Sequence, residues 1–164
     1  MTKLLIFGYG NPGRGDDMLG PELVERIEAL GLEQVCCQND MQLQIEHVTD
    51  LAAHDQILFI DADCSCHPPC KYSRVLPAKD NSYSTHAMTP AALLYLYTQH
   101  FRTAPPKVFL LQIRGYQFDL GATLSAGAAA NLEIASQWAI QACKARNLEV
   151  AMPAPPPPAR EQHA

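Results

Sequence analysis

The chain has 164 residues and a mass of 18.0 kDa, the size of one ordinary domain. Hydrophobic residues make up 48% of it and charged residues 18%, a globular composition that excludes wholesale disorder. With 17 acidic residues against 12 lysines and arginines, the net charge is −5, which argues against nucleic acid as a partner. No apolar run reaches the length of a membrane span or of a signal-peptide core, so we expect a soluble, cytoplasmic protein.

The chain opens with a short buried strand at residues 3–7, followed by a glycine-rich loop at residues 8–17. Four glycines and a proline in this loop indicate unusual backbone angles. A helix follows from about Gly20 and should close at Gly31. Its apolar residues recur at helical spacing and are predicted to face the core: Leu23, Val24, Ile27 and Leu30.

The middle of the chain predicts two more strands, at residues 33–38 and 56–61, on either side of a helix at residues 43–53. That helix is expected to place Ile45, Val48 and Ala52 on one side. The strand at 56–61 is a continuous apolar run ending in Asp61, typical of a strand covered on both faces. No segment of helix length separates it from the next strand, at residues 72–77. Because a parallel crossover needs a dozen or more residues, this fourth strand should run antiparallel to the third.

The last third predicts a helix, a fifth strand at residues 107–113 and a long final helix. Thr89 and Pro90 suit the start of the first of these helices, which runs to about Gln99, and Ser125 can cap the second, which runs to about Arg146. Their expected core residues are Leu93, Leu94, Leu96, Tyr97, Leu132, Ile134, Ala135, Trp138 and Ile140.

This order of strands and helices predicts a three-layer α/β/α sandwich around a five-stranded mixed sheet with one antiparallel strand. We assign it to a single domain over residues 1–150. Residues 151–164 begin with a run rich in proline and should form an extended, mobile tail.

Polar residues that can bind a metal follow three of the predicted strands. Asp16 and Asp17 end the glycine loop, Asp61 ends the third strand, and His86 follows the fourth. In such sandwiches ligands bind beyond the carboxyl ends of the strands. Two carboxylates and an imidazole suit nickel or zinc and would leave a coordination position open for water or substrate. The alternative is that these side chains only cap helices or turn loops, and the residues alone leave both interpretations open.

The glycine loop also satisfies the G-x-G-x-x-G pattern of dinucleotide-binding proteins, through Gly8, Gly10 and Gly13. However, the helix begins too late to point at a pyrophosphate, two aspartates would repel phosphate, and Pro12 removes a donor. A nucleotide-binding oxidoreductase is therefore the less favoured alternative. The remaining histidines have no metal-ligand spacing and most should be solvated: His47, His54, His67, His100 and His163.

The six cysteines fit free thiols better than a disulfide framework, because a domain of this size can bury its core without covalent staples. Four soft ligands fall within one short segment: Cys64, Cys66, His67 and Cys70. Structural zinc sites usually combine two separated ligand pairs, and the sequence contains no CxxC or HxxxH pair. We expect ordinary loop residues here, and a non-catalytic metallochaperone built on this segment is a second alternative.

Residues 6–11 (IFGYGN) and 15–20 (GDDMLG) resemble the opening motif of the nickel–iron hydrogenase maturation proteases. The similarity continues with residues 59–62 (FIDA), 84–86 (STH) and 112–116 (QIRGY). It covers about the first 145 residues, with order and spacing preserved. The resemblance implies the same α/β/α sandwich.

The resemblance also implies an endopeptidase that removes the C-terminal extension of a hydrogenase large-subunit precursor after nickel insertion. Its metal-contacting residues map onto Asp17, Asp61 and His86, and the candidate supporting residues are Asn11, Asp16 and Asp40. The nickel would be that of the substrate, with another divalent metal as an alternative and no nucleotide cofactor. Two features depart from the family: many members have glutamate at the position of Asp17, and an Asp-Gly-Gly-Thr-like turn is replaced here by residues 37–40.

Overall fold

A five-stranded sheet forms the centre of the computed structural model, which describes residues 1–79 and 88–149. Its strands are β1 (Leu4–Tyr9), β2 (Val35–Asp40), β3 (Gln56–Asp63), β4 (Cys70–Val75) and β5 (Lys107–Arg114). They lie in the order β2-β1-β3-β5-β4, and β4 alone is antiparallel to its neighbour. The predicted direction of the fourth strand is confirmed, although β5 lies between β3 and β4.

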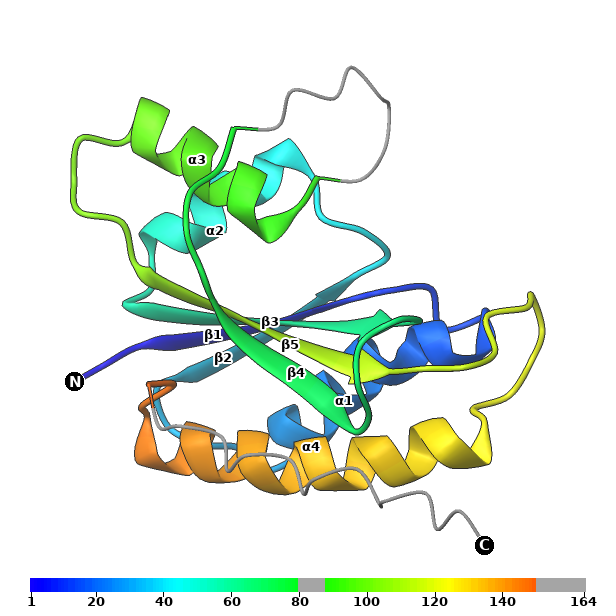
Figure 1. The fold of residues 1–164 in the computed structure, drawn as a ribbon. Coiled ribbons are helices and arrows are strands. Elements are labelled where there is room, and N and C mark those ends of the chain that lie inside the picture. The colour runs from blue at the N-terminus through cyan, green and yellow to red at the C-terminus, as the bar shows by residue number, and fades with distance from the viewer. Residues whose placement is uncertain (80–87, 150–164) are drawn as a thin grey trace, which may run out of the picture.

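Helices cover both faces of this sheet, as Figure 1 shows. One face carries α1 (Leu19–Glu28) and α4 (Ala126–Ala145), and the other carries α2 (Val48–Ala52) and α3 (Pro90–His100). Two 3₁₀ turns precede helices, η1 (Gly15–Met18) before α1 and η2 (Ile45–His47) before α2. The predicted three-layer α/β/α sandwich with a mixed sheet is confirmed. None of the helices in the described ranges combines the length and the apolar character needed to cross a bilayer.

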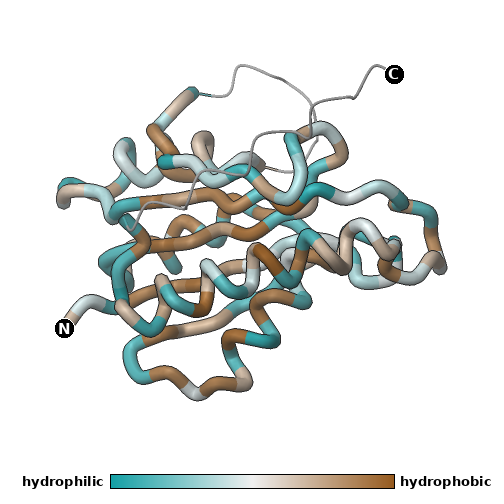
Figure 2. Tube along the Cα trace, turned by 60° about the horizontal axis from the view of Figure 1, so that its bottom comes forward, coloured by the Kyte–Doolittle hydropathy of each residue, from teal (hydrophilic) through white to brown (hydrophobic). Residues whose placement is uncertain are grey.

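Each face of the sheet contributes to its own hydrophobic core. Side chains alternate between the faces of a strand, so Leu4 and Ile6 pack with α1 and α4 whereas Leu5 and Phe7 pack with α2 and α3. The three central strands, β1, β3 and β5, are mostly apolar, and hydrophobic segments lie in the middle of the molecule in Figure 2. This burial on both faces explains why the third strand, whose core segment is Ile57, Leu58, Phe59 and Ile60, reads as a continuous apolar run.

The two predicted helix caps form as expected. The side chain of Thr89 accepts the N–H of Ala92 over 3.1 Å, and Oγ of Ser125 accepts the N–H of Ala128 over 3.2 Å. Each bond satisfies one of the backbone donors that the first turn of a helix leaves without an intrahelical acceptor.

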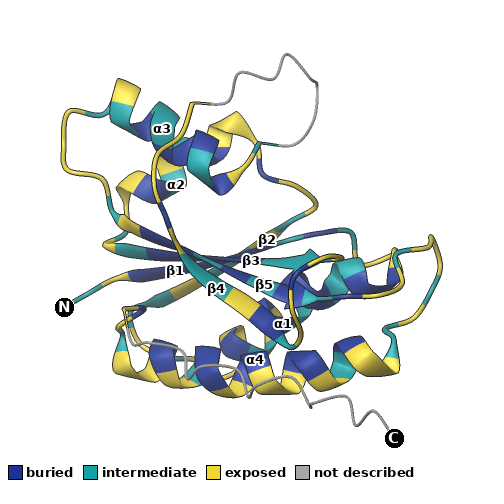
Figure 3. Ribbon diagram, viewed as in Figure 1, coloured by how far each residue is buried: buried dark blue, intermediate teal, exposed yellow. Residues whose placement is uncertain are grey.

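Four predictions of core residues were wrong. Leu30 is exposed because α1 ends at Glu28. Ile45 and Ala52 are exposed because residues 45–52 form a 3₁₀ turn followed by a five-residue helix, which breaks the 3.6-residue spacing. Ile134 is exposed on α4, since the buried stripe of this helix runs through Ala135 and its outer side faces away from the sheet (Figure 3).

Gly20 lets α1 approach the sheet closely. A Cβ at this position would lie 2.3 Å from the carbonyl oxygen of Ile60, which is backbone and cannot rotate away. We therefore expect Gly20→Ala to reduce the free energy of unfolding by about 1–3 kcal/mol, the usual cost of overpacking. Urea unfolding measures this loss, with Glu25→Ala on the exposed side of the same helix as the control. Equal stability of Gly20→Ala and the wild type would contradict this close packing.

Candidate active site

The loop between β1 and α1 folds back on itself around Asp17. The N–H of Asn11 donates to Oδ2 of Asp17 over 2.7 Å. Gly10 has φ of +149°, and a Cβ there would lie 2.1 Å from the carbonyl oxygen of Asp17. A glycine is required at this point because only glycine permits this approach at such a φ. The loop thus holds the carboxylate of Asp17 at the carboxyl end of β1, and Asn11 supports it through its backbone.

The same loop uses all of its backbone N–H groups between residues 10 and 17 inside the protein. Their acceptors, in chain order, are Asp40 O, Asp17 Oδ2, Asn11 Oδ1, Asn11 O, Ala122 O, Gln117 O and Arg14 O. Pro12 has no N–H to offer. A dinucleotide fingerprint works by presenting free N–H groups and a helix N-terminus to phosphate. With its donors satisfied and α1 beginning only at Leu19, this loop is unsuited to that task.

Asp16 is completely buried, with 0% of its surface exposed. Its carboxylate accepts four hydrogen bonds of 2.7–2.9 Å, from the N–H groups of Tyr116, Gln117 and Ser125 and from Oγ of Ser125. Burial alone would raise its pKa, but the hydrogen bonds from Ser125, Tyr116 and Gln117 outweigh burial and lower the pKa. The side chain of Asp16 therefore fastens the glycine loop to the segment between β5 and α4.

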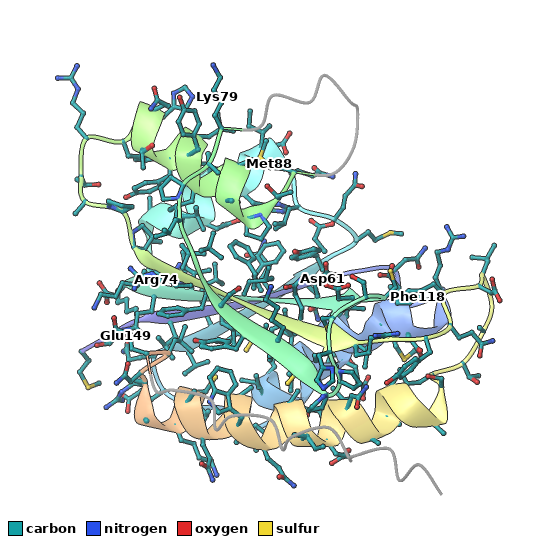
Figure 4. The ribbon with its side chains drawn as sticks, in the orientation of Figure 1. Asp61, Arg74, Lys79, Met88, Phe118 and Glu149 are labelled. Carbon is teal, nitrogen blue, oxygen red and sulfur yellow. The ribbon has the colours of Figure 1, made fainter. Side chains whose placement is uncertain are left out.

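Asp61 lies at the end of β3 that faces the glycine loop, as the labelled side chain in Figure 4 shows. It is half-buried and accepts a hydrogen bond from the hydroxyl of Tyr9. Burial, and after it the negative charge of Asp17, raise the pKa of Asp61 to about 7, although the hydrogen bond from Tyr9 acts to lower it. Asp17 is held beside Gly10 and Asn11, directly after β1, and β1 pairs with β3. The structure therefore brings Asp17 and Asp61 together at the carboxyl edge of the sheet.

Tyr9 links these residues to the core. Burial raises the pKa of its hydroxyl, and the charge of Asp61 together with the hydrogen bond to Asp61 raises it further. Tyr9 therefore remains a neutral donor that points at Asp61. No sequence motif singles out Tyr9 as a functional residue, although strand alternation places it two positions after the buried Phe7 and hence on the same face.

A second carboxylate on β3 is held by its neighbours. Asp63 accepts the N–H and Oγ–H of Ser65 over 2.8 and 2.9 Å, and Nε2–H of Gln112 over 2.8 Å. Burial would raise its pKa, but the hydrogen bonds from Ser65 and Cys66 and the charge of Arg114 lower it. Asp63 is thus a fixed anion, whereas Asp61, two residues earlier, changes charge near neutral pH. This contrast marks Asp61 as the carboxylate suited to proton transfer.

His86, the predicted third member of the site, lies outside the described residues, as does the tail at residues 151–164. Within residues 1–79 and 88–149, the structure contains no group of three histidine, cysteine or acidic side chains placed to hold a metal ion. Two carboxylates alone, such as those of Asp17 and Asp61, are an incomplete ligand set for nickel or zinc, which needs at least one further ligand.

The cysteine-rich segment at residues 64–70 is held by contacts with β5. Sγ of Cys66 lies 3.7 Å from the carbonyl oxygen of Gln112, and Nη1 of Arg114 donates to the carbonyl oxygen of Cys66 over 2.8 Å. Burial raises the pKa of Cys66 and raises that of Cys70 to about 11. In the described part of the chain, no three of the residues Cys64, Cys66, His67 and Cys70 come together as a group that could hold a metal ion.

The prediction was that most of the remaining histidines are solvated, and among the described ones His67 and His100 are exposed whereas His47 is buried. This side chain is buried and contacts Asp40, the candidate supporting residue at the end of β2, with 3.1 Å between Nε2 and Oδ2. The apolar spacing of its own segment did not include His47, so it could not reveal the burial.

Comparison with solved structures found several proteins with this architecture. The NiFe hydrogenase maturation protease HycI from Thermococcus kodakarensis KOD1 superposes with a TM-score of 0.68 at 21% sequence identity, covering 87% of this chain and 93% of that chain. The hydrogenase maturating endopeptidase HybD from E. coli gives a TM-score of 0.66 at 21% identity, over 88% and 93% of the two chains. The solution structure of the endopeptidase HycI from E. coli gives 0.63 at 20% identity, over 87% and 91%.

No family model and no curated protein sequence matches the chain. At about one identical residue in five, the structural matches show a shared architecture across about 87% of the chain. The chain has the fold of the NiFe hydrogenase maturation proteases.

Proposed function

We propose that this protein is an endopeptidase that removes the C-terminal extension of a NiFe hydrogenase large-subunit precursor after nickel insertion. The observation that carries the proposal is that Asp17, held by the N–H of Asn11 directly after β1, and Asp61, on the neighbouring strand β3, lie at the same carboxyl edge of the sheet. The shared fold supports it, because the solved proteins with this architecture are named as maturation proteases of that hydrogenase.

In this proposal Asp17, Asp61 and His86 contact the nickel that the precursor already holds. The metal is then part of the substrate, and contact with it tests whether nickel has been inserted. It also positions the scissile bond next to the two carboxylates. Nickel held in this way can polarise a carbonyl group or lower the pKa of a water molecule.

Asp61 is the proposed general base. A carboxylate oxygen that is not bound to the metal can accept a proton from the attacking water. The neutral hydroxyl of Tyr9 donates to its carboxylate and orients it. Asp17, whose Oδ2 accepts the N–H of Asn11, keeps its position through the glycine loop.

The decisive experiment is incubation of the purified protein with nickel-loaded and nickel-free precursor, followed by measurement of the C-terminal mass. We expect loss of the extension only from the nickel-loaded form. His86→Ala should fold normally, as judged by circular dichroism, and reduce trimming at least 1,000-fold, the scale expected when a group that acts in the transition state is removed. The exposed His100 at the end of α3 gives a matched control, His100→Ala, which should trim normally. Normal trimming by His86→Ala would overturn the site, and no trimming by the wild type would overturn the function.

A further inference from the structure

A buried histidine and a carboxylate meet beside the candidate active site, and the proposed reaction does not use them. His47 is 8% exposed, and its ring stands edge-on to Phe7, with 4.8 Å between centroids and 70° between planes. Nδ1 of His47 lies 2.8 Å from the backbone nitrogen of Gln44. Nε2 lies 3.1 Å from Oδ2 of Asp40. Both ring nitrogens are therefore engaged.

These contacts define which nitrogen carries the proton. The backbone N–H of Gln44 can only donate, so Nδ1 of His47 must accept and have no hydrogen. The neutral ring then carries its proton on Nε2, which donates to Asp40. His47 thus points a hydrogen-bond donor at one oxygen of Asp40.

Asp40 is held at three points but retains access to solvent. Its Oδ1 accepts the N–H of Met41 over 2.7 Å, and its backbone oxygen accepts the N–H of Gly10 over 3.1 Å. With Oδ2 bound to His47, the carboxylate has a fixed orientation, yet 40% of its side chain is exposed. Each carboxylate oxygen can accept more than one hydrogen bond, so Asp40 can still bind a donor from outside.

The register of the strands places Asp40 in line with the active site. Tyr9 is paired with Asp40 across β1 and β2, and on its other side it donates to Asp61 on β3. Paired residues of neighbouring strands lie on the same face of a sheet, so Asp40, Tyr9 and Asp61 share the face that carries α2 and α3. Two strand spacings separate Asp40 from Asp61, or about 10 Å.

An extended polypeptide advances about 3.4 Å per residue. If such a polypeptide crosses the strands with one of its peptide bonds over Asp61, a residue about three positions along that polypeptide lies over Asp40. We propose that Asp40 is a substrate-binding residue, which accepts an N–H donor of the polypeptide about three residues from the bond that is cut, and that His47 is its positioning residue. This inference rests on the proposed peptidase function and assigns its substrate a second point of attachment.

The test compares trimming of nickel-loaded precursor by four variants. Asp40→Asn should raise KM about 10-fold and leave kcat within about twofold, because it weakens binding without touching the reacting atoms. His47→Leu keeps the apolar packing on Phe7 but removes the donor, and should raise KM about fivefold. His47→Gln can again donate from Nε2 and should restore KM to within about twofold of the wild type. His54→Gln, in the same segment but bonded to the carbonyl oxygen of Asp50, should leave KM unchanged.

Calorimetry measures the affinity of the same variants for the precursor, each in an Asp61→Asn background in which the bond is not cut. The dissociation constants should follow the same order as the KM values. An unchanged KM for Asp40→Asn, or failure of His47→Gln to rescue His47→Leu, would overturn the proposal. A lower melting temperature of His47→Leu with unchanged KM would assign the pair a purely structural role and also overturn it. If the wild type fails to cut but the background variant binds precursor, the peptidase function fails and the affinity series still decides the role of Asp40. Absence of both binding and cutting overturns both proposals.

Discussion

Asp16→Asn is expected to lower the free energy of unfolding by about 3–5 kcal/mol, because it leaves buried N–H donors without an acceptor and each such group costs about 1–3 kcal/mol. The four donors around the carboxylate come from the segment between β5 and α4. An amide in its place would direct an NH₂ group at N–H donors, whichever way it turned. Urea unfolding at pH 7 measures the loss. The exposed Asp119 on the same segment provides the control, and Asp119→Asn should change stability by less than about 0.5 kcal/mol.

The effect of Asp16 should also depend on pH. Hydrogen bonding lowers the pKa of Asp16 in the folded protein below its value in the unfolded chain. The stability it contributes is therefore fully present above the unfolded pKa, about 3.9, and is lost as pH falls through the folded pKa. The difference in the free energy of unfolding between the wild type and Asp16→Asn should therefore become smaller at acidic pH. A difference that stays constant from pH 7 to pH 3 would contradict the role of the ionised carboxylate.

Asp61→Asn is expected to act in opposite directions on stability and on activity. The pKa of Asp61 is raised to about 7, so folding favours the protonated form. Below the unfolded pKa of about 3.9 the carboxyl group is protonated in both states and does not reduce the free energy of unfolding. Between that pH and about pH 7, its ionisation reduces the free energy of unfolding progressively. The uncharged amide avoids this cost, so at pH 8 the variant should be more stable than the wild type by about 1–2 kcal/mol. Trimming should fall at least about 1,000-fold, because the proposed base is gone.

Thermal unfolding between pH 4 and pH 8 tests the first part of this expectation. The two curves should nearly coincide at pH 4 and separate as pH rises. Asp63→Asn is a useful comparison, since the pKa of Asp63 is lowered by its hydrogen bonds and by Arg114 and its loss should destabilise the protein at pH 8. Equal stability of Asp61→Asn and wild type at pH 8 would show that Asp61 is not in a strained ionised state.

The architecture and the meeting of Asp17 with Asp61 could be predicted from the sequence because both depend on strand ends. A continuous apolar run ending in a carboxylate fixes the end of β3, and the glycine loop fixes the end of β1. Parallel strands bring those ends to one edge of a sheet. The length of the connection before β4 likewise predicted its direction. These inferences need only the local pattern and the rules of sheet topology.

The separate roles of Asp16 and Asp17 could not be predicted in the same way. The two residues are adjacent and chemically identical, and what distinguishes them is the set of donors on a segment about 100 residues later. His47 was missed for a related reason. Its burial comes from Phe7 and Asp40, which lie on strands β1 and β2, and the apolar spacing of its own segment did not include it. Both the role of Asp16 and the burial of His47 depend on contacts between segments that are distant in the sequence. Such contacts cannot be identified from a single sequence without the fold.

The attachment of Asp16 has a consequence for biosynthesis. Its partners lie 100 to 109 positions later in the chain, and β5, which fills the space between β3 and β4, also emerges late. During translation, therefore, the loop after the first strand cannot form these contacts until about three quarters of the polypeptide has been synthesised. Contacts of such long sequence separation form slowly. The glycine loop that carries Asp17 therefore reaches its final position only near the end of synthesis.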